Sequence, residues 1–232
     1  MNEQVLSLRL KKVGEKVPQG ARLADIGSDH AYLPTFLTIN GKISYAVAGE
    51  VVKGPYESAK KQVAKNLLSE KIIVRLANGL AAIHDEDQVD AITIAGMGGT
   101  LIRQILENGL KQGQLKKNET LILQPNIGER TLREWLMLNG YGIVDEEILE
   151  ENDKIYEIIV AKPVGNVHYT EQELLFGPFL LQEKNETFIK KWQREVKSKE
   201  RVLGDLMKAH VVPQSKVAEV KEQLSWIQEV LV

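Results

Sequence analysis

Short apolar runs alternate with longer amphipathic stretches over the first 163 residues of the chain. A run of four to eight apolar residues between turn signals is typical of a buried strand, and a longer stretch with 3-4 spacing is typical of a helix. Such alternation predicts a mostly parallel sheet covered by helices, an α/β fold. Strands are predicted at residues 22–25, 45–50, 72–76, 91–95 and 120–124, and helices at 55–68, 100–107 and 130–138.

Two more β-like runs, residues 142–149 and 154–161, lie on either side of the polar segment Glu150–Asp153. A short polar loop between such runs predicts an antiparallel hairpin. Added to the five parallel strands, this hairpin gives a sheet of seven strands.

The pattern changes at Lys162–Asn166, which is typical of a linker, so we expect one domain at residues 1–163 and a helical domain at 164–232. Thr170 and Glu173 form a capping box that begins a helix, which Gly177-Pro178 interrupts. Two later stretches with 3-4 spacing predict a coiled-coil-like helical hairpin around Pro213. Their seams are Ile189, Trp192, Val196, Leu203 and Leu206, and Val217, Val220, Leu224, Ile227 and Leu231.

The most informative segment is Asp25-Ile-Gly-Ser-Asp29, which ends the first strand and precedes a helical segment that we expect Pro34 to break. Doubly wound sheets bind nucleotide-type ligands where strands end, and Gly27 lets backbone approach such a ligand. Asp25 and Asp29 would repel a phosphate group but suit a cationic ligand. S-adenosylmethionine, which carries a sulfonium and an amino group and no phosphate, meets that requirement.

Polar residues or glycines also follow the other strands. Glu50 ends the second strand, where a carboxylate accepts hydrogen bonds from ribose hydroxyls, although an ordinary surface glutamate is the simpler alternative. Asn78-Gly79 either contacts the adenine of a cofactor or forms a plain turn. Ala95–Gly99 exposes backbone and lacks the lysine of a phosphate-binding loop, and the amides of Gln124 and Asn126 either read a base edge or cap the next helix.

Composition narrows the function. The chain has 232 residues, 30 basic and 32 acidic, so a nucleic-acid surface has to be a local patch. It has no cysteine and four scattered histidines, which argues against a metal site. His30 is more simply structural than a general base. The polar N-terminal segment does not resemble a secretory signal and no apolar run spans a bilayer, so we expect a cytoplasmic protein without a membrane partner.

The first segment is amphipathic, with Leu6, Leu10 and Val13 on one helical face and a basic stripe of Arg9, Lys12 and Lys16 on another. Residues 184–201 are also locally basic. A solvated face is the simple explanation, and a polyanion partner is the alternative.

Taken together, these motifs resemble those of the bacterial tRNA adenine(22)-N1-methyltransferase family. The matching strings are DIGSDHAYLP at 25–34, GEVVKGP at 49–55, NGL at 78–80, IAGMGG at 94–99 and LQPN at 123–126. The resemblance covers the whole chain. It implies a class I methyltransferase fold, S-adenosylmethionine as methyl donor, tRNA as acceptor and no obligate protein partner.

From this resemblance we expect Arg9, Lys12 and Lys16 to bind the tRNA backbone. We expect them to lie away from the acidic turn, the segment Asp25–Asp29. Tyr32 and Tyr56 are candidate platforms for the acceptor adenine. An RNA-binding scaffold without catalysis, or a methyltransferase for a small molecule or a protein, remain the alternatives. We expect catalytic roles for Asp29, Gly96, Met97, Gln124 and Asn126, and cofactor contacts from Asp25, Gly27, Ser28, Asp29, Glu50, Asn78, Gly79, Ala95 and Gly96.

Overall fold

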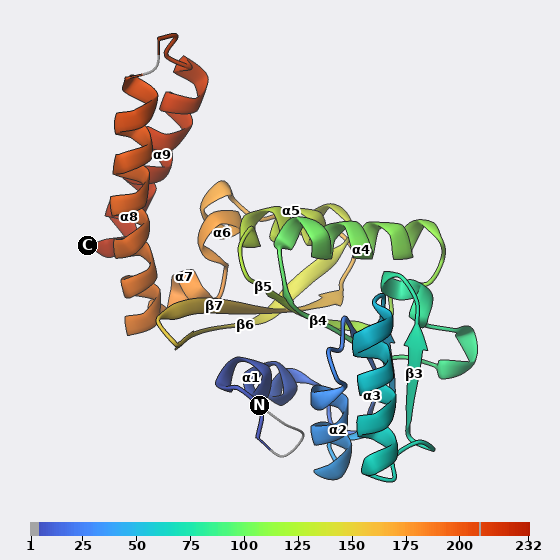
Figure 1. The fold of residues 1–232 in the computed structure, drawn as a ribbon. Coiled ribbons are helices and arrows are strands. Elements are labelled where there is room, and N and C mark those ends of the chain that lie inside the picture. The colour runs from blue at the N-terminus through green and yellow to red at the C-terminus, as the bar shows by residue number, and fades with distance from the viewer. Residues whose placement is uncertain (1–4, 209) are drawn as a thin grey trace. The chain divides into compact units, whose positions relative to one another are not determined.

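The structure is a computed structural model that describes residues 5–208 and 210–232 (Figure 1). It divides into two compact units, one ending at Tyr169 and the other beginning at Thr170. The predicted boundary after residue 163 falls at the end of the last strand and stays a prediction. In the part of the chain that the structure describes, no helix is long and apolar enough to cross a membrane.

The first unit is built on one seven-stranded sheet with the order β3-β2-β1-β4-β5-β7-β6. The first five strands are parallel, and β7 and β6 are antiparallel to their neighbours. This confirms the predicted sheet, with every strand within two residues of its expected bounds. The strands are β1 (Ala21–Ile26), β2 (Ile43–Glu50), β3 (Ile72–Leu76), β4 (Ala91–Met97), β5 (Thr120–Pro125), β6 (Tyr141–Glu151) and β7 (Lys154–Pro163).

The β6–β7 hairpin is tighter than expected. Glu150 and Glu151 belong to β6, so only Asn152 and Asp153 form the turn. Both have positive φ, 51° and 60°, which is the backbone that a two-residue hairpin turn requires.

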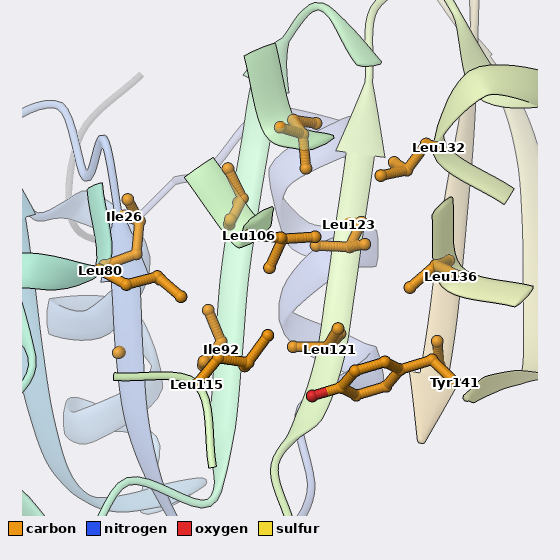
Figure 2. Packing of buried hydrophobic residues seen from close by; sticks show 14 of the residues in the cluster. Ile26, Leu80, Ile92, Leu106, Leu115, Leu121, Leu123, Leu132, Leu136 and Tyr141 are labelled. Carbon is orange, nitrogen blue, oxygen red and sulfur yellow. The ribbon is translucent and has the colours of Figure 1, made fainter. Parts of the chain in front are cut away.

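Helices cover both faces of the sheet: α4 (Gly99–Lys111) and α5 (Glu129–Leu138) on one, and α1 (Leu8–Lys16), α2 (Tyr32–Ile39) and α3 (Lys53–Lys65) on the other (Figure 1). Successive residues of a strand point to opposite faces. Leu121 and Leu123 of β5 therefore pack under α4 and α5, where Figure 2 shows Leu106, Leu132 and Leu136 around them. Ile122, between those two leucines, belongs to the cluster on the other face. Short 3₁₀ segments, η1 (Gly79–Ala82) and η2 (Asp85–Asp87), lie between β3 and β4.

The expectation that Pro34 breaks a helix is wrong. Helix α2 begins at Tyr32, so Pro34 lies in its first turn, where backbone N–H groups have no intrahelical partner to lose. The interruption comes earlier, at Asp29, His30 and Ala31, which have φ values of 36°, 62° and 55°.

The second unit contains α6 (Glu171–Phe176), α7 (Leu180–Glu183), α8 (Glu186–Met207) and α9 (Gln214–Leu231). The predicted capping box of Thr170 and Glu173 is present. Helices α8 and α9 form the predicted hairpin, in which Lys199 Nζ of α8 donates to Gln223 Oε1 of α9 at 2.6 Å. The α9 seam is buried as predicted, except that Val230 replaces Leu231. In α8 the seam differs more: Phe188 and Trp192 are buried, and the other predicted residues, Ile189, Val196, Leu203 and Leu206, are half-buried.

A buried ion triad joins α5 to the hairpin of the first unit. Arg133 is fully buried, and its Nε donates to Glu146 Oε1 at 2.8 Å while its Nη2 donates to Glu157. Burial opposes the charge, yet Glu157 and Glu146 raise the pKa of Arg133 above its usual range. The guanidinium therefore neutralises two carboxylates that have no access to water.

We expect Arg133→Leu to lower the free energy of unfolding by about 3–5 kcal/mol, because it leaves two buried carboxylates without their cation. Urea unfolding measures this. Arg103 is exposed on α4, so Arg103→Leu is the matched control, with an expected change within about 0.5 kcal/mol. Equal effects of the two substitutions would contradict the role given to the triad.

Candidate active site

A pocket of about 230 Å³ lies where β1 and β4 end, at the point in the sheet where the strand order reverses. Parallel α/β sheets bind ligands at such a point. The pocket brings together many of the predicted site residues, among them Arg9 of the basic stripe, which was expected to bind tRNA, and adds Leu10 from α1. It is lined by Arg9, Leu10, Asp25, Gly27, Ser28, Asp29, Ala95, Gly96 and Met97.

The turn after β1 depends on glycine. Gly27 has φ +70°, and a Cβ there would lie 2.2 Å from Cε of Met97. The N–H groups of Gly27 and Ser28 donate to the carbonyl of Gly49 at 2.9 and 3.2 Å. These hydrogen bonds fix the turn to β2, and the absence of a side chain at Gly27 lets its backbone lie close to Met97. A backbone that approaches a ligand needs both properties.

Asp25 organises this turn from inside. Its carboxylate is 4% exposed and accepts hydrogen bonds from Ser28 Oγ at 2.6 Å and from Thr93 Oγ1 at 2.7 Å. Burial raises the pKa of Asp25 to about 6, although the two hydroxyl groups oppose that shift. Because the two hydroxyls already use its oxygens, the geometry supports a role in holding the turn open for a ligand.

Glu50 ends β2 and lies beside the same turn. Its carboxylate accepts a hydrogen bond from the N–H of Asp29. Burial raises its pKa above the usual value, against the effect of that hydrogen bond. The side chain of Asp29, by contrast, is largely exposed and lines the pocket. The acidic turn and its neighbour Glu50 thus combine two buried carboxylates, Asp25 and Glu50, with the open carboxylate of Asp29.

Two amide side chains hold the glycine-rich segment at the end of β4. Gln124 Oε1 accepts from the N–H of Gly96 at 2.9 Å, and Asn126 Nδ2 donates to the carbonyl of Gly96 at 2.8 Å. Gln124 is fully buried, so its amide fixes the peptide of Gly96 and does not line the pocket. Asn126 is exposed, and its side chain lies at the same edge. The catalytic roles of these two residues stay predictions.

Arg9 reaches the pocket from α1. Its Nη1 donates to Gln124 Oε1, and its guanidinium carbon lies 5.4 Å from the ring centre of Tyr156. The expectation that the basic stripe lies away from the acidic turn is therefore wrong for Arg9. No signal in the sequence relates Arg9 to Gln124, 115 positions later.

The two lysines of the stripe contact carboxylates of β6. Lys12 Nζ lies 2.9 Å from Glu147, and Lys16 Nζ lies 2.8 Å from Asp145 and 3.0 Å from Glu147. Hydrogen bonds to Glu147 and Glu15 raise the pKa of Lys12. The apolar face docks as predicted, with Val13 buried and Leu10 packed beside it. These ion pairs compete with any phosphate for the lysines, and the tRNA contact stays a prediction.

Of the remaining predicted residues, Asn78 and Gly79 lie next to Glu50 but outside the pocket. Ala77 N–H donates to the carbonyl of Glu50 at 2.7 Å, so the turn at Asn78-Gly79 starts beside Glu50, but it lines a separate cavity of about 130 Å³. His30 stacks on Tyr32 with ring centres 5.2 Å apart, which fits a structural histidine.

A cavity of about 600 Å³ lies at the opposite ends of the strands, where β4 and β5 begin. It contains none of the predicted site residues. Among the described residues, no group of three or more side chains is arranged to hold a metal ion.

Comparisons with known proteins agree with this geometry. A model of the tRNA (adenine(22)-N(1))-methyltransferase family matches residues 23–229. The tRNA (adenine(22)-N(1))-methyltransferase of Bacillus subtilis (strain 168) is 45% identical over 238 residues, covering 100% of this chain and 99% of that protein.

Solved structures are also similar. A Streptococcus pneumoniae protein in complex with S-adenosyl-L-methionine has 48% identity and a TM-score of 0.89, covering 98% of this chain and 100% of that one. An M. capricolum protein in complex with S-adenosyl-homocysteine has 28% identity and a TM-score of 0.83, covering 97% of each chain.

The raised pKa of Asp25 predicts a specific pH dependence of stability. The folded chain holds this proton up to a pH of about 6, whereas the unfolded chain releases it near 3.8. Stability from this group is therefore present below pH 3.8 and is lost as the pH rises to 6, by about 3 kcal/mol. We expect the wild type to lose most of that amount against Asp25→Asn between pH 4 and pH 7 in urea unfolding. A difference between the two chains that does not change with pH would contradict this.

Proposed function

The chain belongs to the tRNA (adenine(22)-N(1))-methyltransferase family, and from that premise we propose that it methylates N1 of adenine 22 in tRNA, with the pocket at the ends of β1 and β4 as the active site. The observation that carries this is the convergence of Gly27, Asp29 and Gly96 at one pocket, with Glu50 joined to it through the N–H of Asp29.

The residues of the pocket fit S-adenosylmethionine, which supplies an electrophilic methyl group on a sulfonium. Glu50, at the end of β2, has the position and charge to accept ribose hydroxyl hydrogen bonds. Gly27 provides the close backbone approach, and Asp25 and Ser28 keep that turn in shape. Asn78 and Gly79, next to Glu50, are suited to the adenine end of the cofactor.

Arg9 gains a role that the sequence did not predict. The cofactor has one anionic group, the carboxylate of its methionine part, and Arg9 is the cation that lines the pocket. A guanidinium binds a carboxylate with paired hydrogen bonds. We therefore assign Arg9 to the cofactor as well as to Gln124.

The chemistry at the acceptor needs positioning more than proton transfer. Adenine N1 has a lone pair in the plane of the ring, so it attacks the methyl carbon without prior deprotonation. Alignment of the two reacting atoms is then the main task of the protein. The methylated base carries a positive charge, which the exposed carboxylate of Asp29 and the carbonyl of Gly96 are placed to stabilise.

The alternatives have less support. A scaffold that only binds RNA has no need for a buried Asp25 that shapes the pocket or for a clamped Gly96. A small-molecule or protein acceptor finds no support among the relatives, which are tRNA methyltransferases. We expect the chain to act in the cytoplasm without an obligate protein partner.

The proposed function is tested by tritium transfer from labelled S-adenosylmethionine to tRNA, followed by nucleoside analysis. We expect 1-methyladenosine in a tRNA with adenine 22 and none when guanine replaces that base. Equal methylation of both tRNAs would refute adenine 22 as the target.

Asp29→Asn keeps the size of the side chain and removes its charge, so we expect about a hundredfold loss of kcat with little change in Tm.

The different surroundings of Arg9 and Lys12 predict different effects on cofactor affinity. Arg9→Gln removes the cation of the pocket, so we expect about tenfold weaker binding of S-adenosylhomocysteine in calorimetric titration. Lys12→Gln is the matched control on the same helix, and its cofactor affinity should not change. If Lys12 and Lys16 also bind phosphates, Gln at both positions lowers the slope of log affinity for tRNA against log salt by up to about two. Equal cofactor affinities of the Arg9 and Lys12 variants would remove Arg9 from the site.

A further inference from the structure

Ile127 is a large apolar side chain that is 73% exposed, two residues after the end of β5. Scattered apolar residues are common on protein surfaces and by themselves indicate nothing. The surroundings of Ile127 set it apart, because it follows Asn126, whose side chain donates to the carbonyl of Gly96 in the pocket.

The backbone around Ile127 is fixed to the glycine-rich segment. Asn126 N–H donates to the carbonyl of Met97, and Gly99 N–H donates to the carbonyl of Ile127, both at 2.7 Å. A Cβ on Gly99 would lie 2.3 Å from the carbonyl oxygen of Gly128, so the two segments touch without room for a side chain. The backbone of Ile127 is therefore held in a defined position beside the glycine-rich segment.

The edge of the sheet divides into two halves. Glu50 and the Asn78-Gly79 turn, which we assign to the cofactor, follow β2 and β3. The acceptor base then has to approach from the side of β4 and β5. Space is open there, since a Cβ on Gly98 would meet no atom within 4 Å.

We propose that Ile127 is the apolar surface on which the acceptor adenine lies when it leaves the RNA stack; this rests on the proposed function. N1 is on the Watson–Crick edge, so the base has to be turned out and held against an apolar or aromatic side chain. Ile127 supplies that surface, and the exposed Asn126 next to it supplies hydrogen-bonding groups. The rings of Tyr32 and Tyr56, the expected platforms, already contact His30 and Lys60.

The test compares three variants of the full chain. Ile127→Asn removes the apolar surface, and Ile127→Leu keeps it. Leu138→Asn is the matched control, because Leu138 is also 73% exposed and lies at the other end of α5, away from the pocket. The measurements are kcat/KM for tRNA, the affinity for S-adenosylhomocysteine, and the fluorescence of a tRNA with 2-aminopurine at position 22, which brightens when that base is unstacked.

We expect Ile127→Asn to lower kcat/KM about tenfold or more, the effect of losing a few buried carbon atoms from a binding pocket. It should also reduce the rise in 2-aminopurine fluorescence and leave the affinity for S-adenosylhomocysteine unchanged. Ile127→Leu and Leu138→Asn should behave as wild type.

Wild-type kcat/KM in Ile127→Asn would overturn the inference, as would an unchanged fluorescence rise or a parallel loss of cofactor affinity. Failure of the wild-type chain to methylate adenine 22 would instead refute the proposed function, so the two failures are distinguishable.

Discussion

The site depends on one buried carboxylate. Asp25 closes β1, and its oxygens accept hydrogen bonds from Ser28 in the following turn and from Thr93 in β4. A carboxylate loses hydration when it is buried, and hydrogen bonds to the charged form offset part of that cost. The same hydrogen bonds tie the turn to two strands. Three consecutive residues beyond Ser28, from Asp29 to Ala31, have positive φ angles that most side chains disfavour, and Glu50 accepts from the N–H of the first of them.

A second constraint links the N-terminal helix to the catalytic edge. Gln124 Oε1 accepts both from the N–H of Gly96 and from Nη1 of Arg9. One fully buried amide therefore joins the glycine-rich segment to a helix that lies outside the alternating α/β pattern. Helix α1 is further held by Glu151, which accepts from the N–H of Leu8 at 2.6 Å, and by the lysine pairs to β6. Its position is thus part of the geometry of the pocket.

The sequence predicts what local pattern determines. Each strand was found within two residues because its apolar run is bounded by turn residues, and the acidic turn was found because its chemistry lies in five adjacent positions. Contacts between distant segments have no such signal. The place of Arg9 in the pocket and the pairing of Lys16 with Asp145 both depend on how α1 docks on the sheet. The effect of Pro34 differs from the prediction because it depends on where the helix starts, which the local pattern does not determine.

The character of the site follows from the reaction. Adenine N1 attacks without first losing a proton, so a general base gives little advantage. His30 stacks on Tyr32, and its Nε2 lies 3.5 Å from Asp29. Rate then depends on how well donor and acceptor are held. A pocket in which Gly27 closely approaches Met97 and the buried Gln124 fixes the peptide of Gly96 meets that need. The charged side chains are few, and each has a task set by charge alone. In the function proposed above, Asp29 serves the sulfonium, Arg9 the carboxylate and Glu50 the ribose.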